Sequence, residues 1–209
     1  MRAIFGARLL AAATLISVMG IAGCENSATA KGASAQLASA KTSAPANLPW
    51  SKRKGSDEWT RAALSALEAE GVTLLSTVPA DVNAFCPTYA NLGREDRKHF
   101  WVSLLSSVAK HESGWNPGAK GGGGRYLGLM QISPATARHY NCRGSMLNGE
   151  NNMACAVKIA ASNVGRDGAI VSGKGKGWRG VARDWMPLRS TSKRADIASM
   201  TKRQAICGQ

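Results

Sequence analysis

The segment between Arg94 and Ser113 carries the clearest helical pattern in this 209-residue chain, and it limits the folds that are available. Its apolar side chains recur at the spacing of one helix face, which predicts a helix over 94–113. The stripe consists of Phe100, Trp101, Leu104, Leu105 and Val108. A helix with such a stripe needs other elements to cover it, so it predicts a packed domain around this segment.

Further helices are predicted on both sides of this segment. They cover 56–70, 133–140 and 152–164, followed by one or two segments that contain Trp185 and Ile197. Ser56 and Ser133 are candidate N-caps, and Pro134 suits a first helical turn. The stretch 165–180 holds six glycines and is predicted to be mostly loop. Because no strand pattern is convincing, the predicted fold class is mainly α.

The first 24 residues have the pattern of an export signal. Arg2 and Arg8 precede an apolar run over 9–19 that is too short to span a membrane comfortably, which is typical of a signal peptide. The run leads to Ile21-Ala22-Gly23-Cys24, which is similar to a bacterial lipobox. This similarity predicts a protein lipidated at Cys24 and anchored to a bacterial membrane, facing the periplasm. An ordinary secretory signal with a chance cysteine is the alternative.

The remaining chain divides by composition. We expect a signal peptide at 1–23 and a flexible tether at 24–49, which is rich in Ala, Ser and Lys. A helical extension follows at 50–93, and the main domain covers 94–209. Glu25 after the lipidated cysteine favours the outer membrane.

The chain is strongly basic, with 27 Lys and Arg against 13 Asp and Glu and a net charge of +14. Such a balance predicts an anionic partner. Removal of 1–23 takes away two arginines and no acid, which leaves +12, and 174–203 alone carries +7 of this charge. Because an exported protein does not meet the genome, we expect no nucleic acid partner. A membrane surface or an acidic polymer remains as the predicted partner, and a merely solvated basic surface is the alternative.

Four cysteines remain after Cys24, and an even number in an exported chain predicts two disulfides. Cys142 and Cys155 enclose only 12 residues, so we pair them, which leaves Cys86 with Cys207. Zinc is the rival interpretation, but the sequence has no CxxC pair and its three histidines follow no ligand spacing. We therefore expect no metal and no cofactor.

Glu112 is the candidate catalytic residue. At 100° per residue it lies about 120° around the predicted helix from Phe100, next to the apolar stripe. A carboxylate there is partly desolvated, and it faces the negative end of the helix dipole. Both effects raise its pKa, as a general acid at neutral pH requires. The alternative is an amphipathic helix whose last turn reaches the surface.

Two motifs follow at a defined spacing. Glu112 begins the motif Glu-Ser-Gly-Trp-Asn-Pro, and Gly128 begins Gly-Leu-Met-Gln-Ile-Ser-Pro-Ala-Thr-Ala. Together with Asn152-Met153, these blocks resemble the lytic transglycosylase domain of the SLT type, within the lysozyme-like superfamily. The resemblance covers 95–164 and implies a lysozyme-like helical fold, with 94–209 as the catalytic domain.

The resemblance implies cleavage of the β-1,4 bond between N-acetylmuramic acid (MurNAc) and N-acetylglucosamine in peptidoglycan, without water. Glu112 is then the acid that protonates the leaving oxygen and the base that deprotonates the C6 hydroxyl, giving a 1,6-anhydro sugar. Ordinary glycosidases instead need a second carboxylate.

The same resemblance implies roles for the neighbours of Glu112. Ser113 orients the acid or contacts the substrate, and Asn152 hydrogen-bonds in the site. The sugar groove is lined by Gly128, Leu129, Met130 and Gln131. Trp115 and Tyr126 flank this groove, where an aromatic face stacks on sugars, although either residue could instead belong to the core.

The chain departs from the family after Tyr140, because it lacks the late tyrosine whose hydroxyl approaches the acid. Either Trp185 or Tyr126 fills that role, or the role is absent. The glycines at 121–124 predict a mobile loop. A lysozyme-type hydrolase, with Asp167 or Asp184 positioning water, is one alternative function. A non-catalytic peptidoglycan-binding lipoprotein is another.

Overall fold

The computed structural model describes residues 47–173 and 177–208, which form a mainly helical unit. The signal segment 1–23, Cys24 and the tether up to residue 46 lie outside the described residues. The α-helices are α1 (Ser56–Ala69), α2 (Val72–Ser76), α3 (Arg94–Ser113), α4 (Pro134–His139), α5 (Gly149–Asp167) and α6 (Thr191–Lys202). Short 3-10 helices lie between them: η1 (Val82–Ala84), η2 (Tyr89–Asn91), η3 (Gly122–Gly124), η5 (Gly180–Arg183) and η6 (Met186–Arg189).

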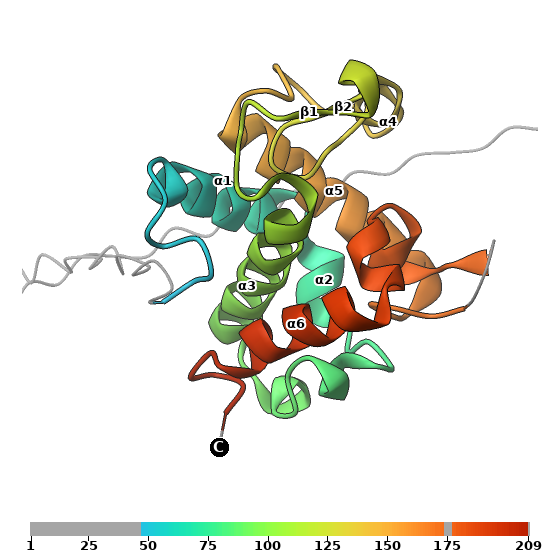
Figure 1. Ribbon diagram of the computed structural model, residues 1–209. Coiled ribbons are helices and arrows are strands. Elements are labelled where there is room, and N and C mark those ends of the chain that lie inside the picture. The colour runs from blue at the N-terminus through green and yellow to red at the C-terminus, as the bar shows by residue number, and fades with distance from the viewer. Residues whose placement is uncertain (1–46, 174–176, 209) are drawn as a thin grey trace, which may run out of the picture. The chain divides into compact units, whose positions relative to one another are not determined.

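Helix α3 runs through the middle of the domain and contacts α1, α2 and α6 (Figure 1). Its predicted bounds are confirmed. The helix is buried on more than the predicted stripe, because every residue from Phe100 to Ala109 is buried. This is possible because three of these residues are small serines. The hydroxyls of Ser106 and Ser107 donate to the carbonyl of Ser103, at 3.0 and 2.8 Å. Both buried hydroxyl donors therefore have a hydrogen-bond partner within the helix.

Two other helix boundaries differ from the prediction. Ser56 is the first residue of α1 and not its cap; Gly55 precedes it with a φ of 88°. Helix α5 begins earlier than residue 152, because the side chain of Asn148 accepts a hydrogen bond from Asn151 N–H at 2.9 Å and caps the helix. It also continues to Asp167.

The mainly α fold contains one short pair of strands that the sequence did not indicate. The strands β1 (Lys120–Gly121) and β2 (Tyr126–Leu127) pair in antiparallel fashion, with Gly121 opposite Tyr126. Two-residue strands are too short to show an alternating pattern in the sequence. The glycines between them form η3, and their φ values of 56°, 69° and 90° explain why this turn is built from glycine.

The region 50–93 shares one core with the rest of the domain. Trp50 is fully buried, and its indole N–H donates to Thr60 Oγ1 at 3.0 Å. Leu48, which the sequence places in the tether, is also buried. The packed part of the chain thus includes at least one residue before Pro49.

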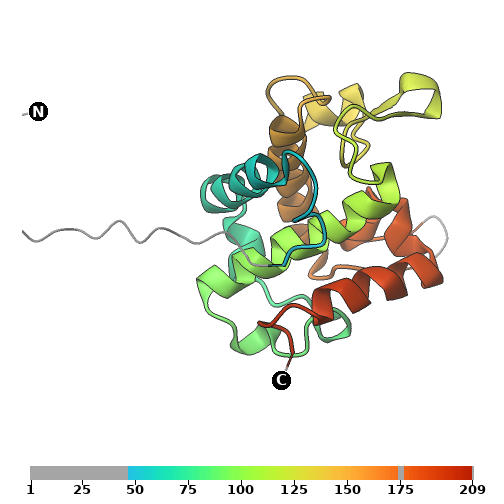
Figure 2. The ribbon, with the colours of Figure 1, turned by 60° about the vertical axis from the view of Figure 1, so that its left-hand side comes forward.

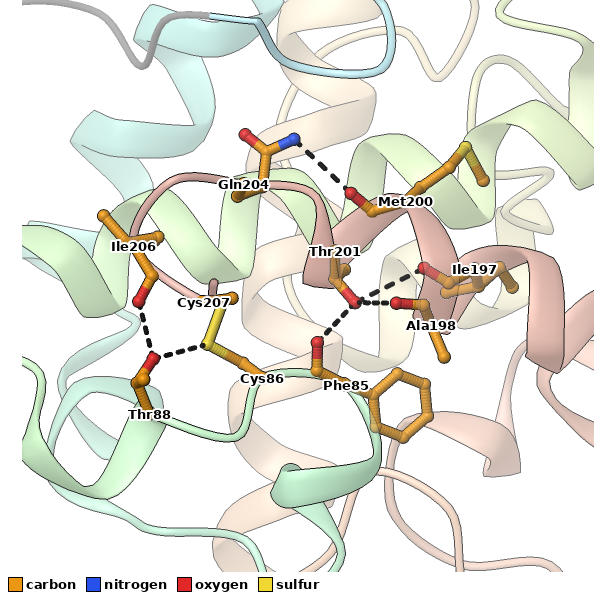
Figure 3. The surroundings of a disulfide bond; sticks show 10 residues. All are labelled: Phe85, Cys86, Thr88, Ile197, Ala198, Met200, Thr201, Gln204, Ile206 and Cys207. Atoms are coloured by element: carbon orange, nitrogen blue, oxygen red, sulfur yellow. Dashed lines mark hydrogen bonds between the residues drawn. A yellow bond between two sulfur atoms is a disulfide. The ribbon is translucent and has the colours of Figure 1, made fainter. Parts of the chain in front are cut away.

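Both predicted disulfides are present, with Cα–Cα distances of 4.7 Å for Cys86–Cys207 and 5.3 Å for Cys142–Cys155. Figure 3 shows how the first one holds the end of the chain against the segment after η1. Beside it, Thr201 Oγ1 donates to Phe85 O at 2.7 Å and Thr88 Oγ1 donates to Ile206 O at 2.6 Å. The C-terminal end of α6 is therefore attached to the η1–η2 region by covalent and polar links.

Within 47–173 and 177–208, no helix has the length and hydropathy needed to cross a bilayer.

Candidate active site

Glu112 lies in the last turn of α3, where the chain leaves the core. The helix is followed by Gly114, whose left-handed φ of 62° turns the chain so that Trp115 N–H reaches Ala109 O at 3.4 Å. Figure 2 shows this end of α3 between the β1–β2 segment and the start of α6. The arrangement leaves the Glu112 side chain half-buried and directed at a cavity that other segments complete.

The cavity at Glu112 has a volume of about 310 Å³. Four segments that are distant in the sequence form its walls: the end of α3, the β1–β2 turn, the loop before α4, and the chain from η5 to η6. The lining residues are Glu112, Gly121, Gly122, Tyr126, Gln131, Asp184, Met186 and Arg189. Three of the sequence-predicted residues, Glu112, Tyr126 and Gln131, are therefore brought together.

The environment of Glu112 raises its pKa to about 7. Burial is the main cause, because a desolvated carboxylate loses the hydration of its charge. The positive charges of Lys193 and Arg189 act in the opposite direction and lower the pKa. Near neutral pH, both protonation states of Glu112 are thus accessible, which suits a group that must donate a proton and then accept one.

The backbone of the loop 128–131 is shaped by two residues with positive φ, Gly128 at 73° and Gln131 at 47°. A side chain at Gly128 would collide with Met146 O and the amide of Asn152, so only glycine fits there. The Gln131 amide N–H donates to Gly128 O at 2.9 Å, which closes the loop on itself.

Asn152 supports the loop 128–131 from the interior of the protein and does not line the Glu112 cavity. It is fully buried, its Oδ1 accepts from Met130 N–H at 2.8 Å, and its Nδ2 donates to Leu127 O and Met146 O, both at 2.9 Å. All the hydrogen-bonding capacity of the side chain is directed at backbone groups. The predicted hydrogen bond of Asn152 in the site is not seen, because its partners in the structure are backbone atoms of the supporting loop.

Other predicted residues also hold the loop. Ser113 Oγ donates to Leu129 O at 2.9 Å, and Trp185 Nε1 donates to Met130 O at 3.0 Å. The side chain of Leu129 is fully buried in the core, so the prediction that it lines the groove is wrong. Met130 lies under an adjoining hollow instead of the Glu112 cavity. Trp185 does not fill the role of the missing tyrosine hydroxyl, because its N–H is engaged by Met130 O.

The two candidate aromatic residues have different positions. Tyr126 is 45% exposed and lines the Glu112 cavity, which makes it the candidate sugar-stacking residue. Trp115 is fixed by its N–H to Ser106 O at 2.8 Å, and the Arg53 guanidinium lies over its ring at 4.7 Å. Its contacts are with α3 and the N-terminal segment, so it belongs to the packing of the domain.

The two aspartates proposed to position water also lie in different surroundings. Asp167 is a structural residue, because hydrogen bonds from Arg166 and from Gly180 N–H lower its pKa to about 2. Asp184 is exposed and lines the Glu112 cavity. Its Oδ2 accepts a hydrogen bond from the buried Asn163 amide at 2.6 Å, which fixes its orientation.

The Glu112 cavity continues into two further hollows of about 210 and 420 Å³. The first shares Tyr126, Gln131 and Asp184 with it, and the second shares Asp184 and Arg183 with the first. Together they form a groove that runs from Glu112 toward α4, where it ends beside His139 and Tyr140. A groove made of several connected hollows suits an extended polymer.

Sequence reasoning missed Arg189 and Met186 on the cavity wall and Arg183 along the groove. Only the general basic character of 174–203 pointed to the arginines. Among the residues that the structure describes, no cluster of three or more His, Cys, Asp or Glu side chains is arranged to hold a metal ion.

Residues 90–170 match the family model described as the Transglycosylase SLT domain. Among solved structures, the chain is similar to Bd0314 DslA in its wild-type form 2, with 29% identity and a TM-score of 0.70, over 78% of this chain and 98% of that chain. Two mutants of DslA match equally well, with 29% identity, TM-scores of 0.70 and 0.69, and 77% of this chain and 97% of each mutant chain covered. A comparison with curated proteins gives no match.

Proposed function

The chain carries an SLT-type, lysozyme-like domain, and from this premise we propose that it is a peptidoglycan lytic transglycosylase. The observation that carries the proposal is the half-buried Glu112, with its pKa near 7, at one end of a groove lined by Tyr126 and Gln131. The substrate is the glycan strand of peptidoglycan, and the products end in 1,6-anhydro-MurNAc.

Glu112 performs both proton transfers in the proposed reaction. As the neutral acid, it protonates the glycosidic oxygen while the bond from C1 of MurNAc to this oxygen breaks. The positive charges of Arg189 and Lys193 favour the carboxylate that this step leaves behind. The carboxylate then takes the proton of the C6 hydroxyl as C6 oxygen bonds to C1, and no water is consumed. The N-acetyl group of the sugar stabilises the cationic centre in between.

Hydrolysis is the second candidate, and the position of Asp184 favours it. Asp184 is a second carboxylate on the wall of the Glu112 cavity, and a second carboxylate is what a glycosidase uses to direct water or to attack C1. In that case Glu112 is still the acid, but the products are reducing sugars.

Mass spectrometry of peptidoglycan digested by the protein tests the proposal. A lytic transglycosylase releases fragments with anhydro ends, each one water lighter than the fragment that a hydrolase releases. Reducing ends from the wild-type protein would assign it to the hydrolases. An Asp184→Asn variant that still releases anhydro ends would show that this carboxylate is not needed for the transglycosylase reaction.

We also propose that Cys24 anchors the protein to a bacterial membrane on its periplasmic side, with the outer membrane favoured. The support is the lipobox-like sequence at the end of an export signal. Cys24→Ser should yield an unlipidated precursor that no longer partitions into detergent in phase separation. A variant that still carries a fatty-acylated N-terminus would contradict the lipoprotein assignment.

A further inference from the structure

Among the residues that the structure describes, Arg189 is the only lysine or arginine that lines the Glu112 cavity. It is the last residue of η6, two positions before α6 begins. Figure 2 shows the end of α3 between this part of the chain and the β1–β2 segment. Arg189 and Tyr126 of β2 therefore reach the cavity from different sides of the last turn of α3.

The guanidinium of Arg189 is held in place by backbone groups. Its Nε donates to Ala182 O at 2.8 Å, and its Nη2 donates to Arg183 O at 2.5 Å. These two bonds use two of the five N–H groups of the side chain. Within 47–173 and 177–208, no carboxylate forms an ion pair with Arg189. A half-buried, oriented positive charge on the cavity wall thus keeps donors for a bound group.

The two carboxyl groups on the cavity wall leave this charge to a ligand. Glu112 has to be neutral when the substrate binds, because it donates the first proton of the proposed reaction. Asp184 Oδ2 accepts from the Asn163 amide at 2.6 Å, and Asp184 also lines the two further hollows toward α4. Arg189 lines neither of those hollows. Arg189 therefore belongs to the end of the groove where Glu112 lies, and Asp184 lies where the groove continues.

The glycan strand offers one kind of group that matches a fixed cation. Its hydroxyl and N-acetyl groups are uncharged, and its ionisable group is the lactyl group on C3 of MurNAc. This group is a neutral amide where a stem peptide is attached and a carboxylate where the peptide has been removed. A guanidinium binds a carboxylate through charge-assisted hydrogen bonds, which are about twice as strong as neutral ones. The MurNAc that presents C1 to Glu112 occupies the same cavity of about 310 Å³ as Arg189.

We infer that Arg189 binds the free lactyl carboxylate of MurNAc and makes the protein selective for glycan strands without stem peptides. The inference rests on the proposed function and extends it by naming the form of peptidoglycan that is cleaved. An amide hydrolysis must supply this substrate: water cleaves the bond between lactyl group and peptide, leaving a carboxylate on the sugar and an amine on the peptide. The protein therefore acts after a peptidoglycan amidase.

The test compares two tetrasaccharides of alternating N-acetylglucosamine and MurNAc. They differ only in their lactyl groups, which are free carboxylates in one and N-methylamides in the other. Binding is measured by calorimetry with the full chain carrying Glu112→Gln, so that neither tetrasaccharide is cleaved. This protein should bind the carboxylate form about tenfold more tightly than the amide form. The preference should shrink in about 1 M salt, because part of it is a charge interaction at a half-exposed site.

A second substitution in the Glu112→Gln protein assigns this preference to Arg189. Arg189→Gln removes the charge but keeps an amide that can donate to Ala182 O, and the preference should fall to within about twofold. Arg189→Lys keeps the charge and should retain part of the preference. Arg61→Gln removes an exposed cation on α1 that lines none of the three hollows, and should leave the preference unchanged. A purely structural role for Arg189 would weaken binding of both tetrasaccharides equally.

A crystal structure of Glu112→Gln with the carboxylate tetrasaccharide gives an answer that does not depend on the folding of an Arg189 variant. The lactyl carboxylate should lie about 3 Å from a guanidinium nitrogen of Arg189. A lactyl group bound elsewhere overturns the inference. Equal binding of the two tetrasaccharides, no binding of either, or a preference that persists in Arg189→Gln also overturns it.

The outcomes for selectivity and for the reaction are distinguishable. A wild-type protein that releases anhydro ends but shows no preference for the carboxylate form contradicts the selectivity alone. A preference that depends on Arg189, in a protein that releases no anhydro ends, supports the lactyl-binding role and contradicts the proposed reaction.

Discussion

The pKa of Glu112 reflects its burial at the end of α3, which raises it, and the positive charges of Lys193 and Arg189, which lower it. Glu112→Gln keeps the shape of the side chain but removes its acid–base chemistry. We expect turnover to fall by about 10²–10⁴-fold or more, because one group serves as acid and base. Binding to insoluble peptidoglycan should persist in a sedimentation assay. Glu58→Gln, an exposed carboxylate on α1, is the control and should retain activity. Near-wild-type turnover by Glu112→Gln would remove Glu112 from the mechanism.

The pKa of Glu112 also couples activity and stability to pH. Activity should fall on the alkaline side with a midpoint near pH 7, where the acid ionises. A folded-state pKa above the unfolded value means that the folded protein favours the neutral carboxyl, so stability is lost as pH rises from about 4.5 through 7. Glu112→Gln has no group that ionises at this position and should not lose this stability. The melting temperature of Glu112→Gln relative to the wild type should therefore be higher at pH 8 than at pH 4. The same difference in melting temperature at both pH values would contradict the assignment.

At the scale of elements, the conformation of the loop 128–131 depends on its hydrogen bonds to Asn152 of α5. Asn152→Ala leaves Met130 N–H and two carbonyls without their buried partner, which should cost roughly 2–4 kcal/mol of unfolding free energy. Turnover should drop at least tenfold in conditions where the variant is fully folded. Asn148→Ala, which removes the cap of the same helix, should cost about 1 kcal/mol and leave turnover nearly unchanged. Denaturant melts measure the loss of stability in each variant, and product assays measure the loss of turnover. Equal losses of turnover in Asn152→Ala and Asn148→Ala would show that α5 affects activity only through its overall stability.

At the scale of the whole molecule, the two disulfides differ in the length of chain that they close. Cys86–Cys207 spans 121 residues and Cys142–Cys155 spans 13. In the loop-entropy model, their removal costs about 5 and 3 kcal/mol respectively. The Cys86→Ser/Cys207→Ser variant should therefore lower the denaturant midpoint more than the Cys142→Ser/Cys155→Ser variant. The opposite order would mean that local packing around α4 and α5 outweighs the entropy of the unfolded chain.

The sequence by itself predicted the central helix and the disulfide pairs and singled out Glu112 as the candidate acid, because each inference depends on short-range spacing or on a counted set of cysteines. Periodicity over 94–113 fixed the bounds of α3, and the spacing from Glu112 to Gly128 indicated the family. Contacts between distant segments were decided by the tertiary structure alone. In the structure, Arg189 and Asp184 line the Glu112 cavity, the side chains of Asn152 and Trp185 hydrogen-bond to the loop 128–131, and Leu129 is buried. No local pattern encodes these roles, since each arises only where α3, α5 and the η5–η6 segment meet.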